Sequence, residues 1–211
     1  MKNLLYILFL LISIPFIGFS QHQEKLDSVS FYKAVQDGME KYLNKIPTGK
    51  EFDFGFNSRD EFREITIGQP LQNYLFQDYS FSGNNDILFK PIQKWTVPLI
   101  IKNQYRCFIN IILSNDGYKA VGFGLPTLAI DLDNFETRKG FKKIKNKALF
   151  IDYALNTYCI VKKDINNNLE FFPFRSINQC ESNVLNEKDK YSSFEVFEIL
   201  KSNNKKLKNE L

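Results

Sequence analysis

The stretch WTVPLIIKNQYRCFINIIL, Trp95–Leu113, is apolar enough either to enter a membrane or to form the centre of a soluble sheet. From Tyr105 to Leu113 the odd positions hold Tyr, Cys, Ile, Ile and Leu, whereas Arg106 and Asn110 occupy even positions. A repeat of two is typical of a strand with one buried face, whereas a membrane helix is apolar all round. We therefore expect a strand in a soluble sheet.

Turn residues on both sides extend this strand into a meander. Asn103 and Gln104 can turn the chain back onto 97–101, and Asn115-Asp116-Gly117 supplies residues that tolerate a left-handed backbone before YKAVGFG, 118–124. A helix with Pro126 in its first turn is expected next, over PTLAIDLDNFETRK. A further hairpin is predicted from NTYCIVKK and LEFFPFRS, which flank the polar loop 164–168.

Helical patterns precede and follow these strands. Apolar residues at three- and four-residue steps predict a helix over about 25–46 that ends before Pro47: Leu26, Val29, Ala34, Val35, Met39, Leu43 and Ile46. Ser192 and Glu195 have capping-box spacing, which predicts a C-terminal helix with an apolar set of Phe194, Val196, Phe197 and Leu200.

The segment between the first helix and the meander has a mixed pattern. In EFDFGFN, Phe52, Phe54 and Phe56 alternate with other residues, which predicts a short strand with three rings on one face. Ser58 and Glu61 have capping-box spacing, so a short helix is expected there, running toward Ile67 before QPLQNYLF extends again.

Composition supports one folded unit behind an export signal. Lys2, the apolar run LLYILFLLISIPFIGF and the small residues around Ser20 predict a signal peptide over 1–20, the alternative being an uncleaved membrane anchor. The remaining 21–211, in a chain that is 44% hydrophobic and 15% aromatic, predict a single α+β domain: an antiparallel sheet of hairpins with N-terminal, central and C-terminal helices packed on it. A sub-boundary is possible in the basic connector 138–147.

Charge and missing motifs exclude several classes of function. Loss of Lys2 lowers the formal net charge from +4 to +3, which suits a periplasmic or extracellular protein and is too small for nucleic-acid binding. The single histidine, His22, lies near the expected new N-terminus, so histidine-based catalysis and common zinc sites are not expected. Neither GxGxxG nor GxxxxGK[ST] occurs, and no cofactor is expected.

Acidic residues leave two weaker possibilities. Asp164, Asn166 and Asn168 resemble the start of a calcium loop, but Leu169 and Arg175 stand where glycine and glutamate are needed, so a polar hairpin tip is expected and no metal site. A carboxylate-dependent glycan hydrolase is the alternative function, because acidic residues accompany aromatic segments: Glu51, Asp53, Asp60, Glu61, Asp131 and Asp133. Solvent exposure at the surface is the simpler expectation for these carboxylates.

The three cysteines permit one disulfide. Cys107 falls on the apolar face of its strand, which predicts a buried thiol. Cys159 and Cys180 flank the second hairpin and could bridge its end to the following loop, although spacing does not determine connectivity.

Two groups of residues are candidates for binding a ligand or partner. Trp95 and Tyr105, near the ends of paired strands, could form a shelf for a ligand, although such rings more often pack in the core. The basic run RKGFKKIKNK could bind an anionic polymer, a lipid surface or an acidic protein through Arg138, Lys139, Lys142 and Lys143. The alternative interpretation is a solvated linker.

The segments SRDEFREITIGQPLQNYLF and WTVPLIIKNQYRCFINIILSNDGYKAVGFG resemble small exported PepSY-like and streptopain-propeptide-like modules. The likeness covers the middle third of the chain and carries over no catalytic residue. It implies a stand-alone binding or inhibitory module, such as an inhibitor or chaperone of a protein partner. We therefore expect an exported, non-enzymatic binding module of the cell envelope or secretome.

Overall fold

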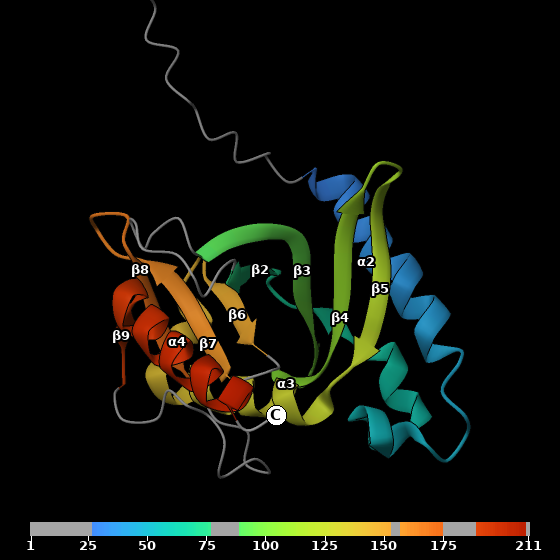
Figure 1. Ribbon diagram of the computed structural model, residues 1–211. Coiled ribbons are helices and arrows are strands. Elements are labelled where there is room, and N and C mark those ends of the chain that lie inside the picture. Colours follow the sequence, from blue (N-terminus) through green and yellow to red (C-terminus); the bar gives the residue numbers. More distant parts are fainter. Residues whose placement is uncertain (1–26, 77–88, 153–156, 175–188, 210–211) are drawn as a thin grey trace, which may run out of the picture.

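The computed structural model describes residues 27–76, 89–152, 157–174 and 189–209 and contains a nine-stranded sheet flanked by helices (Figure 1). The strand order is β5-β4-β3-β2-β6-β7-β8-β9, with β1 beside β3. The strands are β1 Thr66–Ile67, β2 Leu71–Phe76, β3 Phe89–Ile101, β4 Gln104–Ser114, β5 Gly117–Gly124, β6 Ala148–Asp152, β7 Thr157–Lys163, β8 Leu169–Pro173 and β9 Tyr191–Ser192. The helices are α2 Ser28–Leu43, α3 Pro126–Lys139 and α4 Ser193–Asn209, with short 3-10 turns η1 Glu51–Phe54, η2 Arg59–Arg63 and η4 Phe141–Lys143.

The α+β class and the predicted meander are confirmed. β3, β4 and β5 are consecutive antiparallel strands, and Cys107 pairs with Leu99 while Ile109 pairs with Val97. All four side chains are fully buried. Asn103, in the β3–β4 turn, has φ 65°, and Gly117, after the β4–β5 turn, has φ 99°, as left-handed turn residues should.

One parallel pairing, which the sequence did not predict, joins two antiparallel halves of the sheet. Gln72 of β2 pairs with Ala148 of β6, and Tyr74 pairs with Phe150. Antiparallel hairpins are encoded by nearby turn residues, whereas parallel strands meet only after a long crossover. Here the crossover contains β3, β4, β5 and α3, so no local pattern marks the pairing.

The helices cover both faces of the sheet. On β4, Ile109 packs in the cluster beneath α2, whereas the adjacent Phe108 packs on the opposite face with Leu132 and Phe135 of α3. On β6, Phe150 packs with α4, whereas Leu149 packs with α3. Since successive strand residues point to opposite faces, α3 lies on the face opposite α2 and α4.

The predicted starts of the helices agree with the structure better than the predicted sets of buried helix residues do. Ser192 Oγ accepts from Glu195 N at 3.3 Å, and Glu195 Oε2 accepts from Ser192 N at 2.9 Å, which confirms the capping box before α4. Pro126 begins α3 as expected. However, Val29 on α2 is 78% exposed and Phe194 on α4 is 55% exposed, so these two do not belong to the buried stripes.

The strand expected over EFDFGFN is wrong. Residues Glu51–Phe54 form the 3-10 turn η1, which ends at Gly55 with φ 90°. Phe56 is fully buried, whereas Phe52 is 79% exposed, so the rings do not share one face. The expected capping box at Ser58 is also absent: Ser58 makes no side-chain cap, and Glu61 accepts from Asn57 instead.

Gly49 and Gly55 have nearly the same backbone conformation but differ in the space around them. Substitutions at these two positions therefore distinguish the cost of steric overlap from the cost of backbone strain. Gly49 and Gly55 have φ of 84° and 90°, but a Cβ at Gly49 meets nothing within 4 Å, whereas one at Gly55 would overlap the carbonyl oxygen of Arg106. We expect Gly49→Ala to cost about 1–2 kcal/mol of unfolding free energy from left-handed strain. Gly55→Ala should cost about 1–3 kcal/mol more through overpacking. Equal urea midpoints for the two variants would contradict this close approach.

Candidate functional site: an exposed aromatic corner

Two buried carboxylates hold the segment that precedes β1. Glu51 Oε2 accepts from Gly49 N at 2.8 Å, and Glu51 Oε1 lies 3.1 Å from Arg59 Nε. Arg59 also donates to the carbonyl oxygen of Ile46, beyond the end of α2. The pKa of Glu51 is lowered, first by its own backbone N–H and further by Arg59. These contacts tie η1 to both of its flanking segments.

The second carboxylate, Glu61, ties the same segment to the sheet. Glu61 Oε2 accepts from Asn57 N at 2.7 Å, and Glu61 Oε1 accepts from Asn57 Nδ2 at 2.8 Å and from Arg106 of β4 at 3.4 Å. Burial raises the pKa of Glu61, but the hydrogen bonds from Asn57 and the charges of Arg106 and Lys102 outweigh burial and leave the pKa below its ordinary value.

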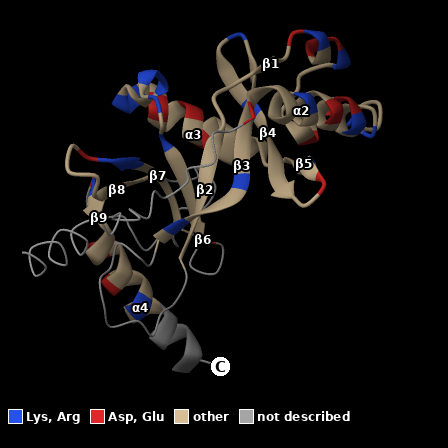
Figure 2. Cartoon of the chain, turned by 90° about the horizontal axis from the view of Figure 1, so that it is seen from above, with Lys and Arg blue, Asp and Glu red and all other residues tan. Residues whose placement is uncertain are grey.

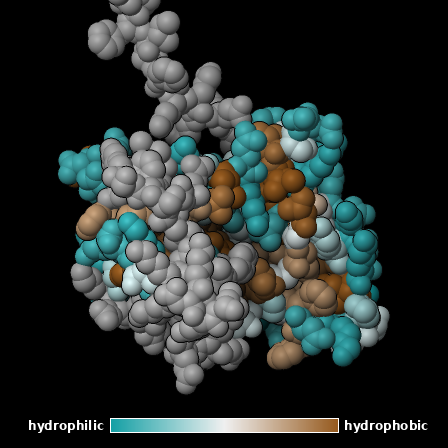
Figure 3. All heavy atoms as spheres, in the orientation of Figure 1, coloured by the Kyte–Doolittle hydropathy of each residue, from teal (hydrophilic) through white to brown (hydrophobic). Residues whose placement is uncertain are grey.

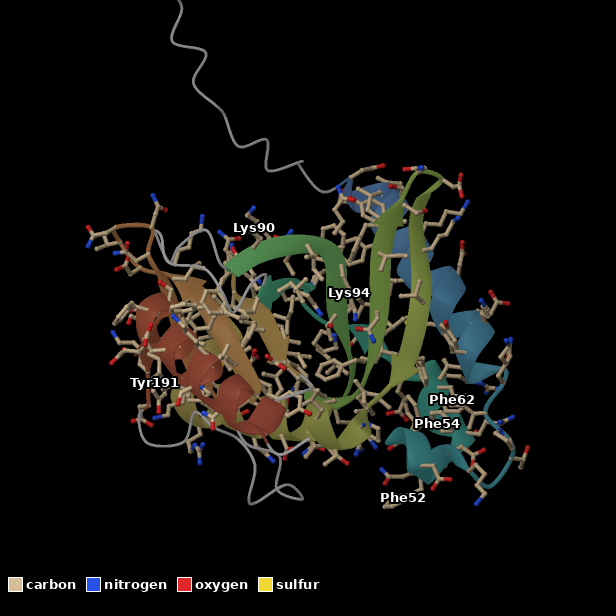
Figure 4. The ribbon with its side chains drawn as sticks, in the orientation of Figure 1. Phe52, Phe54, Phe62, Lys90, Lys94 and Tyr191 are labelled. Carbon is tan, nitrogen blue, oxygen red and sulfur yellow. The ribbon has the colours of Figure 1, made fainter. Side chains whose placement is uncertain are left out.

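This fixed segment presents Phe52 to solvent. The Phe52 ring is 79% exposed, whereas Phe54 packs on Phe123 with ring centroids 6.1 Å apart. Figure 4 shows Phe52 pointing away from the body of the molecule, at the end of η1, while Phe54 and Phe62 lie nearer the sheet. The exposed ring therefore stands on an ordered turn inside the folded chain, and its exposure is not that of a frayed chain end.

Two more apolar side chains are exposed where η1 meets α3. A Cβ at Gly55 would lie 2.9 Å from Pro126 Cβ, so the η1 segment touches the first residue of α3. Leu125, just before the helix, is 44% exposed, and Ile130, one turn further along, is 42% exposed. We call Phe52, Phe54, Leu125 and Ile130 the Phe52 corner. Exposed apolar side chains on an ordered backbone are candidates for a protein contact site.

The nearby edge of the sheet is less suited to contact. β5 is an edge strand of the sheet that the described residues form. Asn110 pairs with Gly122 and Ile111 with Ala120, so Val121 is an extra residue that bulges from the strand. Bulges and edge lysines such as Lys119 are devices that discourage addition of another strand. The corner is therefore a better contact site than the edge.

The structure does not bring Trp95 and Tyr105 together as a ligand shelf. Trp95 packs on the α2 side of the sheet, where its ring lies 5.7 Å from both Phe31 and Tyr118. Tyr105 is buried in the cluster beneath α3, and its hydroxyl donates to Glu136 Oε2 at 2.8 Å. Burial, followed by the charge of Glu136, raises the pKa of Tyr105.

The basic connector is solvated only in part, and the carboxylates Asp131, Asp133 and Glu136 of α3 are buried. Lys147 is 4% exposed and its Nζ lies 2.6 Å from Oε2 of Glu136, which is fully buried. Lys142 lies 2.7 Å from Asp133, and Asp133 also accepts from Tyr105 N at 3.2 Å. The expected surface exposure is wrong for Asp131 and Asp133. Basic and acidic residues that are 9 and 11 positions apart pair with one another here, and one of these pairs is partly exposed while the other is buried.

The remaining residues of the basic run differ in their surroundings. Lys139 lies 3.0 Å from Asp189, whereas Arg138 and Lys143 are exposed. Figure 2 shows basic and acidic residues side by side around α3, so the run does not form a uniformly positive surface.

The carboxylates proposed for hydrolysis are dispersed among separate structural contacts. Glu51 and Glu61 hold the η1 segment, Asp133 binds Lys142, and Asp131 is buried on α3. Asp53 and Asp60 are exposed, and Asp53 lies 3.8 Å from Lys50.

The loop that resembles the start of a calcium site is a polar hairpin tip, as expected: Asp164 accepts from the backbone N–H groups of Asn166 and Asn168 at 2.8 Å each. Among the described residues, no group of three or more His, Cys, Asp or Glu side chains is placed to hold a metal ion.

The cysteines can be followed only in part. Cys107 and Cys159 are both buried, and burial raises the pKa of each thiol. The prediction that Cys107 is buried is confirmed. Cys180 and the expected signal peptide 1–20 lie outside the described residues, so the bridge to Cys180 and the cleavage after Ser20 stay predictions.

Comparisons with known proteins add no relative. No protein-family model matches the chain, and neither a curated protein nor a solved structure matches it. Within the described ranges, no helix combines the length and apolarity needed to cross a bilayer.

The buried pair Glu136–Lys147 should be far more sensitive to loss of one partner than to loss of both. Glu136→Gln leaves Lys147 charged and buried, so we expect a loss of about 3–5 kcal/mol in unfolding free energy. The double variant Glu136→Leu/Lys147→Met should recover most of that loss. Lys119→Ala, which removes an exposed 2.6 Å pair with Asp116, should change the free energy by less than about 1 kcal/mol. Urea denaturation measures all three, and equal effects for the single and double variants would contradict the prediction.

Glu61 should contribute to stability at neutral pH and not in acid. Its pKa is lowered in the folded state, so its contribution is complete above the unfolded pKa of about 4.3 and is lost as the pH falls through the folded value. Glu61→Gln should therefore lower the unfolding free energy at pH about 7 and approach the wild-type value in acid. Glu64→Gln, which removes a carboxyl that is 50% exposed, serves as the control and should track the wild type in denaturant titrations across this pH range.

Proposed function

We propose that this protein is an exported, non-enzymatic binding module of the cell envelope or secretome, and that it acts on a protein partner through the Phe52 corner. One observation carries the proposal: a phenylalanine ring that is 79% exposed stands on a turn that Glu51 and Glu61 hold by hydrogen bonds and ion pairs. Exposing this ring in the free protein leaves about 1.5–3 kcal/mol of burial free energy available to a partner.

The Phe52 ring stands on a turn that is already ordered, which favours a role in recognising a partner. A turn that is already ordered loses little conformational entropy when it docks, so more of the burial free energy becomes affinity. Aromatic anchors at the centre of an apolar area are also the usual hot spots of protein interfaces. Leu125 and Ile130, which are also exposed, follow the point where the η1 segment meets α3 and could add apolar area to the contact.

An inhibitor or chaperone role fits this geometry if Phe52 enters a pocket as a side chain. The 3-10 backbone of Glu51–Phe54 cannot pair with an extended strand of a partner in the way a peptidase substrate does. Phe52 would therefore dock as a knob, and the segment would not be presented for cleavage.

The alternatives of hydrolysis and of binding an anionic surface have less support. The hydrolase alternative requires two carboxylates at a set separation, whereas most of the candidates are engaged in separate contacts with cations or backbone groups. The basic-patch alternative requires an excess of positive charge, whereas Lys139, Lys142 and Lys147 each have an acidic partner.

The test is affinity capture with the chain from Gln21 onward as bait, from the envelope and culture fluid of the parent organism. We expect wild-type bait to retain one protein in stoichiometric amount through a salt gradient, because apolar contacts resist screening. Phe52→Asp should weaken that complex roughly 30-fold, as expected for a hot spot of about 2 kcal/mol. Binding of the recovered protein to each bait is then measured by calorimetry.

Phe194→Asp is the matched control, because Phe194 is also an exposed phenylalanine, at 55%, but lies on α4. It should bind like the wild type. Recovery of a salt-labile polymer alone, or equal loss of binding in both variants, would reject the Phe52 corner as the contact site. Recovery of no protein would reject the protein-partner function.

A further inference from the structure

A second surface with different chemistry lies on the face of the sheet that carries α3, beyond the reach of that helix. Thr96 pairs with Asn110 across β3 and β4, and Lys94 pairs with Ile112 in the next position outward. Lys90 pairs with Leu75 and follows Phe89 of the α4 cluster, so it lies on the opposite face, that of α3. Ile92 lies between Lys90 and Lys94, at a register shift in the pairing of β3 with β2. We call Lys90, Ile92, Lys94 and Ile112 the lysine face.

Described helices do not cover this area. Ile92 and Ile112 are partly exposed and belong to none of the three core clusters. Val121, on the neighbouring β5, is 49% exposed. Figure 3 shows apolar atoms over this part of the sheet, and Figure 4 shows Lys90 and Lys94 along β3. Aliphatic surface therefore lies between positive charges.

Polar side chains beside the lysine face lie within hydrogen-bond distance of one another, although the single hydroxyl hydrogen of Thr96 can be donated to only one of the two amide oxygens at a time. Thr96 Oγ1 lies 3.0 Å from Asn73 Oδ1 and 2.9 Å from Asn110 Oδ1, and Thr96 and Asn73 are only 2% and 6% exposed. Gly122 lies opposite Asn110 and leaves room for its side chain, since a Cβ there would lie 3.2 Å from Asn110 Nδ2. Thr96 and Asn73 are already buried, so a partner that covers the lysine face adds little to the cost of burying these two polar groups.

The charges on the lysine face select an acidic partner. Lys119 is neutralised by Asp116 at 2.6 Å, but Lys90 and Lys94 take part in no ion pair identified among the described residues. Two unpaired ammonium groups favour a partner that brings carboxylates. The apolar side chains between them are aliphatic, whereas sugar platforms are usually aromatic, so a protein segment fits better than a glycan.

The architecture indicates what kind of segment fits. Each covered part of this sheet is packed against one helix: α2 and α4 on one face, and α3 on the other. The bulge at Val121 discourages addition of a strand at the β5 edge. Lys90 and Lys94 are separated by at most about 13 Å of strand, which three turns of helix can span.

We propose that the lysine face binds an amphipathic helix of a partner protein, with aliphatic residues against Ile92 and Ile112 and acidic residues beside Lys90 and Lys94. This site is independent of the Phe52 corner.

The probe is a synthetic stapled helix of about five turns, with leucine along one stripe and glutamate on both sides of it. Its binding to the chain from Gln21 onward is followed by fluorescence anisotropy and by methyl NMR. We expect saturable binding that shifts the methyl signals of Ile92 and Ile112. Lys90→Glu/Lys94→Glu should weaken binding at least about tenfold. Lys33→Glu/Lys45→Glu, at exposed positions on and just after α2, and Phe52→Asp should leave the affinity unchanged.

Three outcomes would overturn the proposal. The first is the absence of saturable shifts at Ile92 and Ile112 up to about 1 mM peptide. The second is equal binding of a peptide with the same composition and a central proline, which would mean that helical shape is irrelevant. The third is equally tight binding of poly-glutamate, which would mean that the face only attracts polyanions. These three measurements do not depend on the Phe52 corner, so they test the lysine face even if the corner binds no partner.

Discussion

The fold depends on the parallel contact between β2 and β6, because this contact alone turns two antiparallel hairpin systems into one sheet. β6 begins at Ala148, directly after Lys147, whose ammonium group is buried against Glu136 of α3. The ion pair therefore sets where the chain enters β6, while Tyr105 donates to the same carboxylate from β4. A charge in the interior is tolerated only with such partners, so α3, β4 and β6 are held in one arrangement.

Buried ion pairs of this kind explain why carboxylates that were candidates for catalysis in the sequence have structural roles in the fold. Glu136 and Asp133 hold the connector after α3, and Glu51 and Glu61 hold η1. Burial makes each carboxylate dependent on its cation and leaves little freedom to act on a substrate. Among the side chains left at the surface are apolar ones on an ordered backbone, such as Phe52, which suit binding.

The two proposed surfaces differ in how they would recognise a partner. The Phe52 corner offers a protruding ring, which fits a pocket and resists salt. The lysine face is an area of sheet along the bent strand β3 (Figure 1), with aliphatic side chains beside cations, so its affinity should fall as salt screens the charges. Because the corner is formed by η1 and the start of α3, whereas the lysine face lies on β3 and β4, one protein can use both surfaces.

Local patterns were sufficient for much of this architecture. The alternation from Tyr105 to Leu113, Pro126 at the start of α3, and the Ser192–Glu195 box each act within a few residues, and the structure contains all three features. Only the tertiary structure decided the pairing of Gln72 with Ala148, the burial of Glu136 with Lys147, and the exposure of Phe52. Each of these depends on which distant segments become neighbours, and free energies of burial and charge pairing exist only after those neighbours are in place.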